Sequence, residues 1–160
     1  MIDIKRSDIY IFLLRVSLGV LFFYAGITKV INPNWSAAGY LKGAKTLPEL
    51  YNFLLQPDIL PIVNFVNEWE LTLLGVSLLL GISVRLSSYL GALLMLLYYI
   101  PTLQFPYAGA NSFLVDQHII YILVLLFLGE IRAGRIWGLE KWCSNLSICS
   151  KYPKLREWLG

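Results

Sequence analysis

The chain has 160 residues, a length typical of a single domain, so residues 1–160 are treated as one unit. Apolar residues make up 58% of it and charged residues only 14%, about half the charged share of a soluble domain. A net charge of +3 does not provide the dense basic face of a nucleic-acid-binding protein, and two cysteines are too few for a disulfide scaffold. The composition predicts a small integral membrane protein in contact with lipid.

Four apolar runs are long enough to be considered as membrane helices. The first is 23 residues long, which matches a hydrocarbon core of about 30 Å at about 1.5 Å per residue. None of the runs alternates as a barrel strand does, and a lone segment in lipid must satisfy its own backbone hydrogen bonds. We therefore expect an all-α, integral membrane four-helix bundle. The predicted spans are residues 9–31, 62–82, 86–103 and 114–131.

The distribution of Lys and Arg outside these runs predicts the orientation. Nine lie on the side of the two termini and two lie on the other side. By the positive-inside rule both termini are cytoplasmic, which requires an even number of spans. We expect a multi-pass protein of the cell (plasma) membrane, with residues 132–160 as a cytoplasmic tail resting on the lipid surface. The nine residues are Lys5, Arg6, Arg85, Arg132, Arg135, Lys141, Lys151, Lys154 and Arg156; the two are Lys42 and Lys45.

The first connection, residues 32–61, has a pattern of its own. Thr46 and Glu49 are spaced as in a capping box, Pro48 suits a first helical turn, and apolar residues follow. We expect a short helix at the outer interface, which either covers the mouth of the bundle or acts as a lid or docking surface.

Two cations lie within the first run. Arg15 and Lys29 share a 4-3-4-3 spacing with Gly19, Phe22 and Gly26, which predicts one stripe of a helix whose glycines allow close approach. Lys29 is near enough to the end of the run for its ammonium to reach the interface. Arg15 lies about 9 Å inside, so we expect its guanidinium to face inward and to pair with a carboxylate or with main-chain carbonyls.

Ionisable groups from three predicted helices gather on the outer side. Glu68 and Glu70 begin the second helix and Asp116 and His118 begin the fourth, at the same depth as Lys29. About 200° separates Glu68 from Glu70, so only one of them faces the bundle centre, and the sequence does not decide which. We expect a polar pocket open to the outside, with proton carriers beside a cation; the alternative is that these groups only hold helix ends together. The candidate catalytic residues are His118, Glu68, Glu70 and Asp116, and the candidate substrate-binding residues are Lys29 and Arg15.

The sequence lacks the motifs of a resident cofactor. It has no Gly-x-Gly-x-x-Gly, no phosphate loop and no Cys-x-x-Cys, and one histidine cannot supply both axial ligands of a haem. Cys143 and Cys149 match no strong metal pattern and are interpreted as structural or free thiols in a reducing compartment. We expect no bound metal, haem or flavin, so any redox chemistry uses a diffusible or partner-held cofactor.

Several segments, in order along the chain, resemble the DoxX/DoxD family of membrane proteins. Residues 14–29 (Leu-Arg-Val-Ser-Leu-Gly-Val-Leu-Phe-Phe-Tyr-Ala-Gly-Ile-Thr-Lys) are similar to the family's first-helix signature. Residues 35–41, 74–85, 116–118 and 134–139 continue the resemblance, which covers about residues 10–140. It implies a four-helix membrane bundle.

The branch that the chain resembles supplies the DoxD subunit of thiosulfate:quinone oxidoreductase, which is accompanied by a second small subunit, DoxA. The resemblance implies that two thiosulfates are joined into tetrathionate and that two electrons pass to a membrane quinone. A cationic outer pocket suits the dianion, and an apolar slot between helices suits the quinone. Two other hypotheses stay open: a non-enzymatic membrane scaffold or assembly factor for a redox complex, and a small transporter, which four helices without a repeat disfavour. The sequence leaves the oligomeric state open, including a homo-oligomer.

Overall fold

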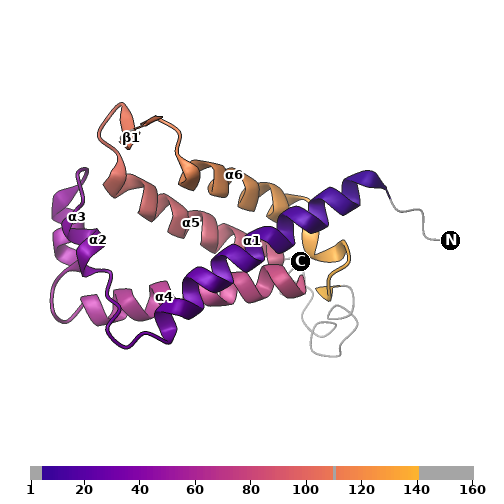
Figure 1. Ribbon diagram of the computed structural model, residues 1–160, viewed down its shortest axis with the longest axis horizontal. Coiled ribbons are helices and arrows are strands. Elements are labelled where there is room, and N and C mark those ends of the chain that lie inside the picture. The colour runs from indigo at the N-terminus through magenta and orange to yellow at the C-terminus, as the bar shows by residue number, and fades with distance from the viewer. Residues whose placement is uncertain (1–4, 110, 141–160) are drawn as a thin grey trace.

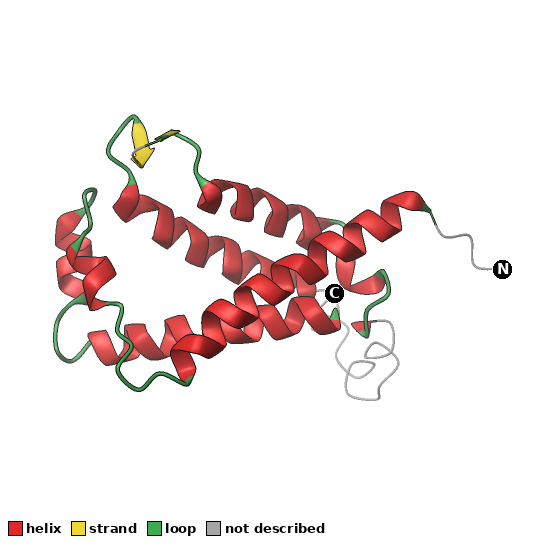
Figure 2. Cartoon of the chain, viewed as in Figure 1, coloured by secondary structure: helices red, strands yellow, loops and turns green. Residues whose placement is uncertain are grey.

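The computed structural model describes residues 5–109 and 111–140, and it is helical apart from one small hairpin (Figures 1 and 2). Three helices of the described chain are long and apolar enough to cross a membrane. They are α1 (Arg6–Val30), α4 (Leu60–Leu80) and α5 (Val84–Thr102), each within three residues of a predicted span. The predicted all-α class is therefore confirmed.

The segment predicted as a fourth span, residues 114–131, contains a shorter helix, α6 (Gln117–Glu130). Its 14 residues rise about 21 Å, less than the hydrocarbon core of about 30 Å. The apolar residues before it are not helical, because Leu114 has a left-handed backbone (φ 56°) and the Asp116 side chain caps the first turn of α6. Ahead of Leu114, β1 (Tyr107–Gly109) and β2 (Ser112–Phe113) form an antiparallel hairpin.

The four longer helices form two pairs. Helix α1 packs along α4, α6 packs along α5, and α4 and α5 make fewer contacts with each other. In Figure 1 the pairs meet at the end that carries the α4–α5 turn and the short 3-10 helix η1 (Ala133–Arg135). They diverge toward the end that carries the hairpin, α2 (Ala38–Lys42) and α3 (Pro48–Leu54). These are called the η1 end and the hairpin end.

The stripe predicted on the first helix is buried as expected. Arg15, Gly19, Phe22 and Gly26 are all buried on α1. A Cβ added at Gly26 would lie 2.4 Å from the backbone nitrogen of Thr72 on α4, so only glycine lets the two helices approach this closely. The α1–α4 pair is therefore fixed by backbone-to-backbone proximity. The main apolar core continues from it and includes Leu18, Phe22, Leu71, Leu74, Leu78, Met95, Leu125 and Leu128.

The first connection forms two short helices that cover a second apolar cluster at the hairpin end. The predicted helix after Thr46 is α3, but the predicted capping box does not form. Leu47 precedes α3 with a left-handed backbone (φ 52°), and the Thr46 hydroxyl donates instead to the backbone carbonyl of Leu103. The second cluster is built on Ala37, Leu41 and Tyr51.

The described part of the predicted tail, residues 132–140, packs against the protein. The backbone N–H of Leu139 donates to Leu80 O and that of Glu140 to Gly81 O, each at 3.0 Å. The rest of the predicted tail, with Cys143 and Cys149, lies outside the described residues.

Candidate functional site

Lys29 points into the protein and forms a polar cluster with two neutral side chains. Its Nζ donates to Asn67 Oδ1 at 2.8 Å and to the Tyr98 hydroxyl at 3.2 Å. Asn67 Nδ2 also donates to that hydroxyl, and Nζ lies 4.7 Å from the centroid of the Trp35 ring. The ammonium of this α1 residue is therefore held by groups from α4, α5 and the first connection.

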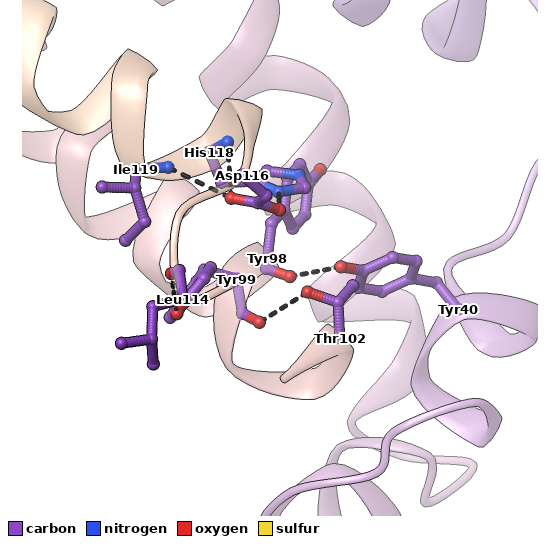
Figure 3. Close-up of polar contacts among 8 residues, drawn as sticks. All are labelled: Tyr40, Tyr98, Tyr99, Thr102, Leu114, Asp116, His118 and Ile119. Carbon is purple, nitrogen blue, oxygen red and sulfur yellow. Dashed lines mark hydrogen bonds and ion pairs between the residues drawn. The ribbon is translucent and has the colours of Figure 1, made fainter. Parts of the chain in front are cut away.

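Asp116 and His118 lie at the start of α6, where the His118 ring contacts the Tyr98 ring. Asp116 Oδ1 accepts from the backbone N–H groups of His118 (2.9 Å) and Ile119 (3.3 Å), and Oδ2 lies 2.6 Å from His118 Nδ1 (Figure 3). The His118 ring packs edge-on to the Tyr98 ring with 5.9 Å between centroids. Asp116 thus both caps the helix and fixes the histidine ring, and Tyr98 connects this pair to Lys29.

Tyr40 of α2 covers Tyr98 from the hairpin end. Its hydroxyl donates to the Tyr98 backbone carbonyl (Figure 3), and the two rings are 5.6 Å apart. Burial raises the pKa of Tyr40 to about 12, with smaller contributions from Tyr51 and Asp116 in the same direction. The hydroxyl therefore keeps its proton at neutral pH and remains a donor.

An apolar cavity of about 340 Å³ lies beside this cluster. It is enclosed by α4 and α5 on one side and by the first connection with α2 and α3 on the other. Asn67, Glu70 and Tyr98 supply polar groups to a wall that is otherwise mostly aliphatic. The aliphatic lining includes Leu41, Leu54, Val63, Val66, Leu94 and Leu97.

The two glutamates of the predicted site have different surroundings. Glu70 lines the apolar cavity, whereas Glu68 is the carboxylate whose charge acts on Lys29. Both side chains are half-buried.

Arg15 lies at the η1 end, well away from Lys29, and is fully buried. Its Nη1 donates to Leu78 O at 2.8 Å, and Nη2 donates to Ile136 O at 3.2 Å and to Trp137 O at 3.4 Å. The predicted inward pairing with main-chain carbonyls is confirmed. Because about 21 Å of helix separates residues 15 and 29, the structure does not bring Arg15 into the pocket as a substrate-binding residue.

A glutamate that sequence reasoning did not single out lies near Arg15. Glu140 is buried and its Oε1 accepts from Arg135 Nε at 3.0 Å. Burial raises the pKa of the Glu140 carboxyl, and Arg135, Arg132 and Arg15 partly counteract that rise. We call Arg15, Arg135, Glu140 and the three carbonyls the Arg15 clasp, because they attach residues 132–140 to α1 and α4.

The sequence model of the DoxX family matches residues 10–102, more than half of the chain. The chain belongs to the DoxX family. Together with three helices of membrane-spanning length, this membership indicates a membrane protein. No curated protein and no solved structure matches the chain.

The DoxX match covers most of the cluster but not all of it. Arg15, Lys29, Asn67 and Tyr98 lie inside the matched residues, as do both glutamates; the segments 116–118 and 134–139, which also resemble the family, lie beyond them. The match identifies DoxX and no branch within it. In the described residues of this DoxX protein, no three His, Cys, Asp or Glu side chains are grouped as they would be around a metal ion.

Sequence reasoning missed the neutral members of the cluster. Asn67 lies three residues before Glu70, so the helical spacing of polar residues on α4 was a signal for it. Tyr98 had no such signal, because a tyrosine near the end of a span is also typical of the aromatic belt at a membrane interface.

Proposed function

We propose that this DoxX protein is the membrane subunit of a quinone-linked oxidoreductase. In this proposal it oxidises thiosulfate to tetrathionate together with a second small subunit resembling DoxA, and membrane quinone is the electron acceptor. The substrate and the partner come from the resemblance to DoxD, and the quinone is supported by the shape and chemistry of the cavity.

The observation that carries the proposal is the apolar cavity with a polar cluster at one side. At about 340 Å³ it lies at the lower end of the range for small-molecule sites, and its few polar groups are grouped at Asn67, Glu70 and Tyr98. A quinone ring has an apolar body and two carbonyl oxygens, so it needs an apolar slot with a small number of hydrogen-bond donors. The Tyr98 hydroxyl and the Asn67 amide are such donors.

Two thiosulfate dianions lose two electrons in total and join through a new S–S bond, while the quinone takes up those two electrons and two protons. Lys29 supplies a fixed positive charge next to Tyr98, which stabilises negative charge developing at the polar side of the cavity. Glu70 lines the cavity and is the nearest titratable donor for one proton. His118, oriented by Asp116, is the second candidate proton carrier.

The polar substrate and the partner are assigned to the hairpin end. A wider depression of about 760 Å³ is lined there by Lys45, Thr102, Gln104 and Tyr40. Tyr40 also lines the apolar cavity, so this side chain borders both spaces. A dianion arriving from water meets the cationic Lys45 at this depression.

For the membrane arrangement we propose four spans in the plasma membrane with both termini cytoplasmic. Figure 1 shows three segments at the η1 end: the start of α1, the α4–α5 turn and η1 itself. These segments carry or adjoin four arginines, Arg6, Arg85, Arg132 and Arg135, which favour the cytoplasmic side. Helix α6 follows α5 and serves as the fourth span, with Ile131 following its last turn. In this arrangement α3 lies at the outer interface.

The test is thiosulfate-dependent quinone reduction by the chain with its partner subunit in lipid nanodiscs. Lys29→Met, Tyr98→Phe and His118→Ala are each expected to lower kcat/KM by about tenfold or more, because each removes a group that contacts the reacting molecule or orients its proton donor. Tyr24→Phe is the control for Tyr98→Phe, since Tyr24 is 70% exposed on α1.

Two results would contradict the proposal in different ways. Unchanged activity when Lys29, His118, Glu68 and Glu70 are replaced together would show that the site is wrong. Absence of activity in the wild-type complex, combined with tight binding to another membrane protein, would favour the scaffold or assembly factor.

A further inference from the structure

A groove of about 480 Å³ continues the apolar cavity toward the η1 end, between α4 and α5. Leu73, Leu74 and Leu90 are among its lining residues. Val66 and Glu70 line both the groove and the cavity. The two spaces therefore meet at these two side chains.

The lining residues lie on single helical rows, which shows that the two spaces form one trough. On α5, Leu86 and Leu90 line the groove while Leu94 and Tyr98 line the cavity, and these positions are four residues apart. On α4 the shared residues Val66 and Glu70 are also four apart. The groove extends along α4 from Val66 to Ser77, about 16 Å at about 1.5 Å per residue.

The two parts of the trough differ in what covers them. The cavity is partly covered by residues of the first connection and α3, including Ala37, Tyr51 and Leu54, although its lining residue Ile62 is 62% exposed. The groove is lined by α4, α5 and their turn alone among the described residues, and its rim leucines Leu73 and Leu90 are 59% and 48% exposed. On helices of membrane-spanning length such an exposed apolar rim faces hydrocarbon.

The groove lining is mostly apolar, and two of its serines are already hydrogen-bonded within the protein. Its serines Ser77 and Ser87 share a hydrogen bond at 2.6 Å, and the hydroxyl of Ser77 also lies 2.6 Å from Ile82 O. Ser83 of the α4–α5 turn also lines the groove, and the other two polar side chains, Glu70 and Trp69, lie at its cavity end. The trough therefore has most of its hydrogen-bonding groups at the cavity end and is mostly apolar along α4 and α5 toward the η1 end, which is the polarity of a ring-headed lipid with one hydrocarbon tail.

We propose that the α4–α5 groove holds the hydrocarbon tail of the quinone whose ring occupies the cavity. In this proposal the groove is also the path by which the quinone enters from the bilayer. Val66 and Glu70 lie where the groove joins the cavity. This inference rests on the proposed function, since it places the tail of the proposed acceptor and gives its route to Tyr98.

The test compares two probes with the same ring, 2,3-dimethoxy-5-methyl-1,4-benzoquinone, one without a tail and one with a decyl chain. Binding is measured in phosphatidylcholine nanodiscs, so phospholipid chains compete throughout, and Kd is expressed per lipid. Leu90→Trp fills the groove and is expected to raise the Kd of the decyl probe by about tenfold, a free-energy change of about 1.4 kcal/mol. It is expected to leave the tail-less probe unchanged. The matched control is Leu93→Trp, which is equally exposed (55%) but does not line the groove.

A second measurement locates the tail directly. A decyl probe that ends in a diazirine is expected to crosslink to residues 73–77 and 86–90. Crosslinks to the outward faces of α1 or α6 instead, or a Leu90→Trp protein that binds both probes as the wild type does, would overturn the groove assignment.

The outcomes separate this inference from the function on which it rests. If the tail-less ring binds and Tyr98→Phe weakens that binding, while Leu90→Trp leaves the decyl probe unaffected, the groove inference alone fails. If neither probe binds the wild-type protein, or binding is insensitive to Tyr98→Phe, the proposed quinone site fails as well.

Discussion

Tyr98 shows which residues of a membrane site a sequence can and cannot reveal. Lys29 and His118 stood out because an ionisable group in an apolar helix is costly and therefore has a partner or a cavity. Both contact the Tyr98 side chain, which carries no charge and was not singled out. A neutral donor such as Tyr98 or Asn67 has a low free-energy cost near the end of a membrane helix, so such residues occur there without a special role. Only the three-dimensional arrangement identifies these two as members of the cluster.

Arg15 gives a prediction at the same scale. Arg15→Met removes the donor to the Leu78, Ile136 and Trp137 carbonyls, of which the bond to Leu78 is buried and the other two are part-buried. We expect a loss of roughly 3 kcal/mol in the free energy of unfolding, seen as a lower Tm in detergent. Arg15→Lys is expected to recover only part of this loss, because one ammonium cannot reproduce a planar fork that reaches three carbonyls.

The control for Arg15 is Arg6→Met, which removes an exposed arginine at the start of the same helix. A Tm of Arg15→Met equal to that of the wild type and of Arg6→Met would show that the guanidinium is not held in the clasp.

At the scale of elements, hydropathy located the three long helices well and the fourth less well. The backbone of α1, α4 and α5 follows the apolar runs because helical hydrogen bonding is the default for such segments. In the run at residues 114–131, Leu114 has a left-handed backbone and the Asp116 side chain caps the helix, so α6 begins only after them. A hydropathy average over many residues does not detect either feature. The capping box before α3 failed for a related reason, since Thr46 found a partner 57 residues away, at Leu103.

The segment that contains η1 has a predicted pH dependence through Glu140. Burial raises the pKa of this carboxyl above its ordinary value of 4.5, so the folded chain holds the proton more tightly than the unfolded chain does. Its contribution to stability is therefore fully present below pH 4.5 and is lost as the pH rises through the folded-state pKa. As the pH rises, we expect the Tm of the wild type to fall relative to that of Glu140→Gln. The measurement is thermal unfolding of both proteins between pH 4 and about pH 8.

Glu49→Gln is the matched control for Glu140→Gln, because Glu49 is an exposed carboxylate on α3. Its Tm is expected to follow that of the wild type at every pH. Parallel curves for Glu140→Gln and the wild type would show that the Glu140 carboxyl has the same proton affinity in both states.

For the whole molecule, the two ends of the helix pairs predict a labelling pattern. In a background with Cys143 and Cys149 replaced by serine, Lys45→Cys at the hairpin end is expected to react with a membrane-impermeant maleimide in intact cells. Ser83→Cys in the α4–α5 turn is expected to react only after the cells are opened, because the proposed orientation puts the basic η1 end on the cytoplasmic side. Protection of Lys45→Cys in intact cells would reverse the orientation and place the depression near Tyr40 on the inside.

The Arg15 clasp also has a consequence for how the chain is made. The carbonyls that receive Arg15 lie 63, 121 and 122 residues away in sequence. While α1 is being inserted during synthesis, its arginine has none of these partners, and such a residue near a helix centre costs about 2.5–3.5 kcal/mol to insert. The first helix therefore enters the bilayer before its arginine has hydrogen-bond partners. The cost of inserting Arg15 is fully offset only after residues 136 and 137 have left the ribosome. A nascent chain that stalls earlier keeps an unshielded guanidinium in lipid, which gives membrane proteases a chemical mark for an unfinished product.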